Sequence, residues 1–366
     1  MFNQRGFSLF GIFFLVAVVV VGGTAFYFAS RQKSSGKKLV GVTKQSREQC
    51  DLKPKPREFS LAPYYSGPLV DAHVHMPIAS RIVATVAKQF GFEDMPVLEG
   101  ELSPQNLFCL FESEGIKQTI GFHMLSKFSP STGHIEQMAK NYPGKFAHFY
   151  LPPPIHELLI SPAETEAIIT QPQGLFRGIG EISFEKGTFT RASPFDQPFS
   201  DLIEIARKHK LVVMIHPAAS HQDEIKKLAT QFPDVTFLLH GGQEQEWIAG
   251  LLASHRNLYY SLDANMTSLY GFERRHDSEP ITKEQWLAFI RQNFDKKVQE
   301  ATSKWKAKIE ANPDQYVWGT DRWYGWQFDY EVGGLLEEFA RSLVGKLDPA
   351  VQQKFAYQNA ERLLGQ

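Results

Sequence analysis

Two histidines one residue apart are the first sign of chemistry in this chain. The stretch "DAHVHM" covers residues 71–76 and places His73 and His75 behind Asp71. Four more ionisable residues end or directly follow apolar runs later in the chain: Glu181, His216, His240 and Asp321. Imidazole and carboxylate ligands without sulfur suit Zn²⁺, and also Mn²⁺, Fe²⁺ or Ni²⁺. The pattern predicts a divalent metal site of the catalytic kind.

Each of these residues, taken singly, also has a purely structural interpretation. A lone histidine at a strand end is most often a hydrogen-bonded structural residue, and Asp71 could be a turn or cap residue. Glu181 could pair with Arg177, and Asp321 with Arg322. Taken together, these interpretations require several coincidences at one place. An ionisable group that ends an apolar strand is costly unless it is paired or metal-bound, so the set favours a metal site.

The elements that must position these residues follow from the apolar runs. Eight short apolar stretches alternate with amphipathic ones, and they lie at residues 69–76, 118–124, 146–153, 176–183, 211–218, 235–242, 258–265 and 316–323. Eight strands, each followed by a helix or loop, predict a (β/α)₈ TIM barrel. A doubly wound open sheet is the alternative, but no glycine-rich phosphate loop follows the first strand. The helix expected after the seventh strand, at 282–310, is long and charged.

The barrel interpretation brings the polar residues to one rim. Chemistry in such barrels gathers at the carboxyl ends of the strands, where Glu181, His216, His240 and Asp321 are expected. Side chains alternate along a strand, so His73 and His75 should both point inward. Asp71 should share that face and orient a histidine ring.

The first 66 residues are expected to lie outside the barrel domain. Residues 6–30 carry no charge and exceed the roughly 20 residues that span a bilayer. This segment predicts a single-pass N-terminal membrane anchor or a secretory signal. More positive charge follows the segment than precedes it, which favours a cytoplasmic domain, whereas its short N-terminal region is typical of an export signal and favours an extracytoplasmic catalytic domain. Residues 31–66 are polar and basic and predict a linker, so the barrel is expected over residues 67–366.

The net charge and the cysteine content argue against nucleic-acid binding and against sites built from cysteines. The net charge is −1 and the pI is about 6.9, which gives no reason to expect nucleic acid as a partner. The two cysteines lie in very different settings, Cys50 in the polar stretch and Cys109 in an apolar helical one. We therefore expect neither a disulfide framework nor a thiolate zinc site, and Cys109 is expected to be a small core residue.

Several motifs together resemble the amidohydrolase superfamily. They are "DAHVH", "GIGEI", "IHP", "LLHGG", "GTDRW" and "NAERLLG", spread over residues 68–366. They are most similar to the amidohydrolase-related branch that also holds decarboxylases and lactonases. The resemblance implies that His73, His75, His216 and Asp321 bind one metal ion, most readily Zn²⁺. It places Glu181 where two-metal members have a bridging ligand, and His240 where a residue binds a second ion or polarises the substrate.

The expected activity is metal-dependent hydrolysis. A metal-activated water would attack a C–N or C–O bond, as in an amide, lactone or ester, of a small substrate. Asp321 would accept the proton of the water and return it to the leaving group. His123, Asp263 and Arg322 also end or follow strands and could contact the substrate or the ligands. The alternatives are a metal-dependent decarboxylase, a phosphodiesterase like the TatD nucleases, and an inactive membrane-tethered binding barrel.

Overall fold

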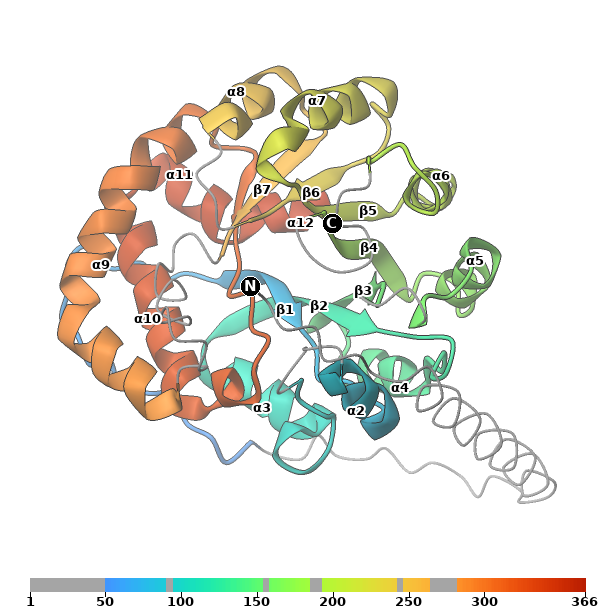
Figure 1. Ribbon diagram of the computed structural model, residues 1–366. Coiled ribbons are helices and arrows are strands. Elements are labelled where there is room, and N and C mark those ends of the chain that lie inside the picture. Colours follow the sequence, from blue (N-terminus) through green and yellow to red (C-terminus); the bar gives the residue numbers. More distant parts are fainter. Residues whose placement is uncertain (1–49, 90–94, 154–157, 185–192, 242–245, 264–281) are drawn as a thin grey trace, which may run out of the picture. The chain divides into compact units, whose positions relative to one another are not determined.

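Eight parallel strands build the centre of the molecule. The structure is a computed structural model that describes residues 50–89, 95–153, 158–184, 193–241, 246–263 and 282–366. The strands follow one another in sequence order around a single sheet (Figure 1). They are β1 (Leu69–His75), β2 (Ile116–Met124), β3 (Phe146–Leu151), β4 (Phe176–Ser183), β5 (Val212–His216), β6 (Phe237–Leu239), β7 (Leu258–Leu262) and β8 (Tyr316–Trp318). The predicted (β/α)₈ barrel is confirmed.

Helices surround this sheet (Figure 1). They are α2 (Arg81–Gln89), α3 (Pro104–Ser113), α4 (Gly133–Asn141), α5 (Pro162–Thr170), α6 (Phe199–His209), α7 (Gln222–Gln231), α8 (Glu246–Ser254), α9 (Lys283–Ala311), α10 (Tyr330–Lys346), α11 (Pro349–Gln353) and α12 (Asn359–Leu363). The expected long segment after β7 is one continuous helix, α9. Its start is fixed by a capping box, in which Thr282 and Gln285 each accept a hydrogen bond from the other's backbone N–H.

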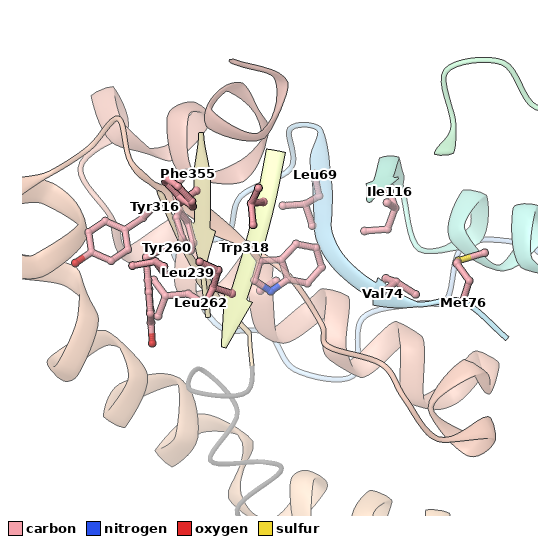
Figure 2. Packing of buried hydrophobic residues seen from close by; sticks show 14 of the residues in the cluster. Leu69, Val74, Met76, Ile116, Leu239, Tyr260, Leu262, Tyr316, Trp318 and Phe355 are labelled. Carbon is pink, nitrogen blue, oxygen red and sulfur yellow. The ribbon is translucent and has the colours of Figure 1, made fainter. Parts of the chain in front are cut away.

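Two apolar cores lie on opposite faces of the strands. Residues such as Ile120, Phe149 and Leu238 fill the inside of the barrel. A larger core lies between the strands and the helices, and Figure 2 shows Tyr260, Tyr316 and Trp318 within it. Because the strands are buried on both faces, they read as continuous apolar runs in the sequence.

The barrel closes between its first and last strands. The backbone N–H of His75 donates a hydrogen bond to the carbonyl oxygen of Arg322 at 3.0 Å. The N–H of Asp321 donates to the carbonyl oxygen of His73 at 2.8 Å. Asp71 reinforces this seam, because its carboxylate accepts hydrogen bonds from the N–H and the hydroxyl of Thr320 at 2.9 and 2.7 Å. The seam places the carboxyl end of β1 beside the residues that follow β8.

The segment from Cys50 to residue 66 belongs to the barrel domain, although it was expected to be linker. The buried carboxylate of Glu338 accepts hydrogen bonds from the backbone N–H groups of Glu58 and Phe59, both at 2.8 Å. The ring of Phe59 stacks on Phe294 of α9, with ring centroids 4.0 Å apart. No helix within the described ranges is long and apolar enough to span a membrane, and the segment at 6–30 lies outside those ranges.

A disulfide joins Cys50 to Cys109, and it corrects two expectations. The cysteines do pair, and Cys109 is not simply a small core residue. The polar setting of Cys50 concealed the pairing, because the chain leading into the barrel folds back onto α3 and brings the two Cα atoms to 5.3 Å.

We expect this disulfide to stabilise the domain measurably. It closes a loop with a sequence separation of 59 residues, for which the chain-entropy model gives about 4 kcal/mol. The double variant Cys50→Ser/Cys109→Ser should therefore unfold at lower urea concentration than the oxidised protein. The reduced wild type is the matched control and should behave like the variant. Equal stability of all three would contradict the pairing.

Candidate metal centre

Six side chains converge at the carboxyl ends of the strands, and we refer to them as the ligand cluster: His73, His75, Glu181, His216, His240 and Asp321. The first part of it surrounds the Nε2 atoms of the two β1 histidines. The Nε2 of His75 lies 3.2 Å from one oxygen of Glu181 and 3.2 Å from one oxygen of Asp321. The Nε2 of His73 lies 3.5 Å from the same two oxygens.

The second part of the ligand cluster lies on the other side of Glu181. Its Oε1 atom is 2.8 Å from Nδ1 of His216 and 2.7 Å from Nε2 of His240. Glu181 therefore stands between two groups of potential ligands, with Oε2 facing the β1 histidines and Oε1 facing the histidines of β5 and β6. The structure thus brings together all six residues that the sequence suggested.

Asp263 holds two of the rings from behind. Its carboxylate lies 3.0 Å from Nδ1 of His73 and 2.8 Å from Nδ1 of His240. Asp263 is fully buried, and these contacts turn the Nε2 atoms of both rings towards Glu181. This is the role of a carboxylate that orients metal-binding histidines.

Asp71 does not orient a ring, contrary to expectation. It accepts a hydrogen bond from the backbone N–H of His73 at 3.2 Å, besides its contacts with Thr320. The pairing of β1 with β2 shifts register between Asp71 and Val74. Such a bulge breaks the two-residue alternation, so Asp71 cannot be assigned to the face of His73 by counting residues.

Carboxylates dominate the electrostatics of the cluster. Burial would lower the pKa of His73, but the carboxylates of Asp321, Asp263 and Glu181 outweigh it and raise that pKa to about 9. Burial also opposes a charged His240, yet Asp263 and Glu181 hold its pKa well above the usual value. The nearby rings of His240, His216 and His73 keep the pKa of Glu181 well below its usual range despite burial. The carboxylates at the rim therefore stabilise the protonated, positively charged forms of His73 and His240.

These residues fit a divalent metal ion. One nitrogen or oxygen atom from each of His73, His75, Glu181 and Asp321 lies within 4.8 Å of the others, and the same holds for Glu181, His216 and His240. Ligands at about 2.1 Å from a tetrahedral ion lie about 3.4 Å apart, which is close to the spacing around the β1 histidines. The Nε2 of His73 is also buried without a hydrogen bond. Asp321 adopts a left-handed backbone with φ of 52°, a conformation that is uncommon for residues other than glycine.

Arg322 faces away from the ligand cluster, so it is not a substrate contact. Its fully buried guanidinium forms a two-pronged ion pair with Glu114, at 2.9 and 2.6 Å. Glu114 caps α3 and lies 208 residues away in sequence, so no local pattern could reveal the pair. The ion pair anchors the chain directly after Asp321 to the helix layer.

Glu114→Gln is expected to destabilise the protein by about 3–5 kcal/mol, because it withdraws the carboxylate charge from a buried guanidinium. Urea unfolding monitored by circular dichroism measures this loss. The double variant Glu114→Leu/Arg322→Met removes both charges and should recover most of the stability. A single variant as stable as the wild type would disprove the importance of the pair.

His123 also points away from the site. Phe122, its neighbour on β2, packs against the ring of His73 with centroids 4.9 Å apart, so the alternation turns His123 outward. There its Nε2 lies 2.9 Å from Nδ1 of His148 on β3, and its ring centroid is 5.8 Å from that of His134 on α4. Burial lowers the pKa of both His134 and His148 to about 4. His123 is thus part of a buried histidine group rather than a substrate contact.

This histidine group should make the fold sensitive to acid. Because the folded-state pKa values lie below the unfolded value of 6.5, the unfolded chain binds more protons, and stability falls as the pH drops from about 6.5 towards 4. Between pH 7 and pH 5 we expect a loss of about 2 kcal/mol for each of His134 and His148. The variant His148→Gln should lose less over this interval than the wild type, whereas His255→Gln, outside the group, should not differ from it. Identical pH dependence of all three would count against the assignment.

A parallel eight-stranded barrel with imidazole and carboxylate ligands at the carboxyl ends of its strands has the architecture of a metal-dependent barrel enzyme. A family model described as amidohydrolase matches residues 70–366. The chain belongs to this amidohydrolase family, and the protein is an enzyme of the amidohydrolase superfamily.

Solved structures share the fold at low sequence identity. An amidohydrolase from Burkholderia multivorans with bound zinc superposes with a TM-score of 0.52 at 12% identity, over 82% of this chain and 99% of that chain. A probable 2-pyrone-4,6-dicarboxylic acid hydrolase from Acinetobacter baumannii, with citric acid bound, gives 0.51 at 11% identity, over 81% and 99%. No curated protein matches the sequence at a significant level. Likenesses at this identity concern the barrel fold alone.

Proposed function

We propose that the protein is a metal-dependent hydrolase that cleaves a C–N or C–O bond of a small substrate. The observation that carries this proposal is the ligand cluster, in which four imidazoles and two carboxylates meet at the barrel rim. His73, His75, Asp321 and Glu181 would hold one ion, and Glu181 together with His216 and His240 would hold a second. Zinc is the proposed metal, since it accepts this nitrogen and oxygen ligand set. When bound, the metal supplies a Lewis acid and a water that is acidic near neutral pH.

Asp321 is the proposed proton carrier of the reaction. Its side chain is 22% exposed, whereas those of His73, His75, Glu181 and His240 are between 0% and 11% exposed. It is thus the carboxylate best placed to meet substrate and solvent. Asp321 accepts a proton from the attacking water and delivers it to the leaving nitrogen or oxygen. His240 is better suited to holding metal than to contacting substrate, because both its ring nitrogens face carboxylates.

Metal analysis combined with a substrate panel tests this function. The purified protein should contain bound divalent metal and hydrolyse at least one member of a panel of amides, esters and lactones. A chelator should abolish the activity, and added Zn²⁺ should restore it. Release of carbon dioxide from aryl carboxylates would instead identify a decarboxylase, and cleavage of a phosphodiester a nuclease-like enzyme. A protein that binds no metal and ignores the chelator would refute all three.

We also propose that the barrel is tethered to a membrane through residues 6–30 and faces an oxidising compartment outside the cytoplasm. The Cys50–Cys109 disulfide supports this, because such bonds persist mainly in oxidising compartments. Alkylation of cell-extracted protein with a maleimide polymer provides the test. We expect a mass shift only after reduction. Modification of both thiols before reduction would contradict the proposed location.

A further inference from the structure

A narrow apolar pocket opens directly beside the ligand cluster. Among the described residues that line it, His75 is the only ionisable one, and the others are apolar, including Met76, Met124, Leu151 and Trp323. The Trp323 ring packs edge-on against the His75 ring, with centroids 4.5 Å apart. Since Nε2 of His75 faces Glu181 and Asp321, the pocket shares a wall with the proposed metal centre.

The pocket lies at the top of the barrel interior. Met124 ends β2 and Leu151 ends β3, and both pack with Phe122 and Phe149 in the inner core. A substrate group entering here would rest on the uppermost apolar layer of the barrel. The cavity volume is only about 10 Å³, close to the room that one water molecule needs. A substrate group therefore enters when the flexible side chains of Met76 and Met124 move aside.

Among the residues that the structure describes, no side chain lining the pocket offers a counter-charge for an anionic group. Arg322 is committed to Glu114 in the helix layer, and His123 points outward to His148. A broader depression nearby in the described part carries Arg81 and Lys283, but Arg81 pairs with Glu99 at 2.6 Å and Lys283 with Asp329 at 2.7 Å. A carboxylate placed against Met124 and Leu151 would lose its hydration without gaining a partner, which is costly.

We infer that this pocket binds an uncharged apolar group of the substrate, a short alkyl chain or the edge of a ring, attached next to the bond that is cleaved. The inference rests on the proposed function, because it takes the reacting carbonyl to lie at the ligand cluster. The substrate class is thus an amide, ester or lactone whose acyl side carries a neutral apolar substituent.

Three hydroxamates of matched structure test the pocket without relying on catalysis. Hydroxamates chelate zinc, so acetohydroxamate, butanohydroxamate and succinic acid monohydroxamate differ only in what they place beyond the metal: a methyl group, a propyl group and a chain of equal length ending in carboxylate. We expect the zinc-loaded full-length protein to bind butanohydroxamate at least tenfold more tightly than the succinic compound in calorimetry. Equal or tighter binding of the succinic compound would overturn the pocket assignment.

Two lysine substitutions sharpen this comparison. Met124→Lys places a cation in the pocket and should shift the preference at least tenfold towards the succinic compound. Phe128→Lys places the same cation four residues further on, at a side chain that is 50% exposed and outside the pocket lining, and it should leave the wild-type ratio unchanged. Identical ratios in both variants would refute the inference. If no hydroxamate binds, including acetohydroxamate, the metal centre itself fails and the proposed function with it. The wild-type comparison stands even if Met124→Lys does not fold.

Discussion

Replacing Asp321 with asparagine is expected to lower kcat by about 10²–10⁴-fold, the usual contribution of a positioned general acid–base. Asparagine keeps an oxygen atom in the place that lies 3.2 Å from Nε2 of His75, but it cannot accept and return a proton at neutral pH. At saturating Zn²⁺ the metal content should therefore stay close to that of the wild type, although the affinity falls because a negative ligand is lost, and KM should change little. The measurement is steady-state kinetics on whichever substrate the panel identifies, with metal analysis of the same samples.

The control for this variant is an aspartate far from the rim. Asp234 is 55% exposed and pairs with Arg207 on the outside of the barrel, so Asp234→Asn should retain wild-type kcat. An Asp321→Asn enzyme with unchanged kcat would exclude Asp321 as the proton carrier. If the variant instead loses its metal, Asp321 acts mainly as a ligand, and its catalytic role must be assigned elsewhere.

The strands and the convergence of the ligand cluster were predictable because both depend on local pattern. Each apolar run was long enough to cross the barrel, and five of them carried a member of the ligand cluster near the carboxyl end, as in Glu181 of β4 and His216 of β5. Parallel strands bring such ends to one rim whatever the details of packing. The position of these residues therefore followed from the fold class alone.

The direction of several side chains was not predictable, because it depends on register. In "GFHM" the residues on both sides of His123 are apolar, so the sequence does not tell which face lies inside the barrel. The bulge between Asp71 and Val74 likewise arises from the pairing of β1 with β2 and leaves no mark in "DAHVH". For Asp263 the position could be predicted, but its contacts could not. Its position after β7 suggested a role at the rim, but only the structure shows that it contacts both His73 and His240.

Contacts between residues that are distant in sequence also could not be predicted from local sequence patterns. Glu114 meets Arg322 across 208 residues, and Cys50 meets Cys109 because the chain leading into the barrel folds back onto α3. In both cases one member of the pair had a simpler local interpretation, Arg322 as a rim residue and Cys109 as a core residue. Tertiary packing decided against these interpretations.

Replacing Glu181 with glutamine is expected to reduce the number of bound metal ions from two to one per chain. The two oxygens of Glu181 serve different groups of histidines, Oε2 at 3.2 Å from His75 and Oε1 at 2.8 Å from His216. The lowered pKa keeps the carboxylate ionised near neutral pH, so both oxygens can act as ligands. Glutamine offers one oxygen and one NH₂ group, and the NH₂ group cannot bind a cation.

Calorimetric titration of metal-free protein with Zn²⁺, together with elemental analysis, measures this change. The wild type should saturate at two ions, and Glu181→Gln at one, with an affinity weakened on the order of 10²-fold because a negative ligand is lost. Glu204→Gln, on the exposed face of α6, should bind like the wild type. Saturation of the wild type at a single ion would leave the histidines of β5 and β6 without a metal of their own. Glu181 would then hold His216 and His240 by hydrogen bonds, and the one-metal chemistry would depend on His73, His75 and Asp321.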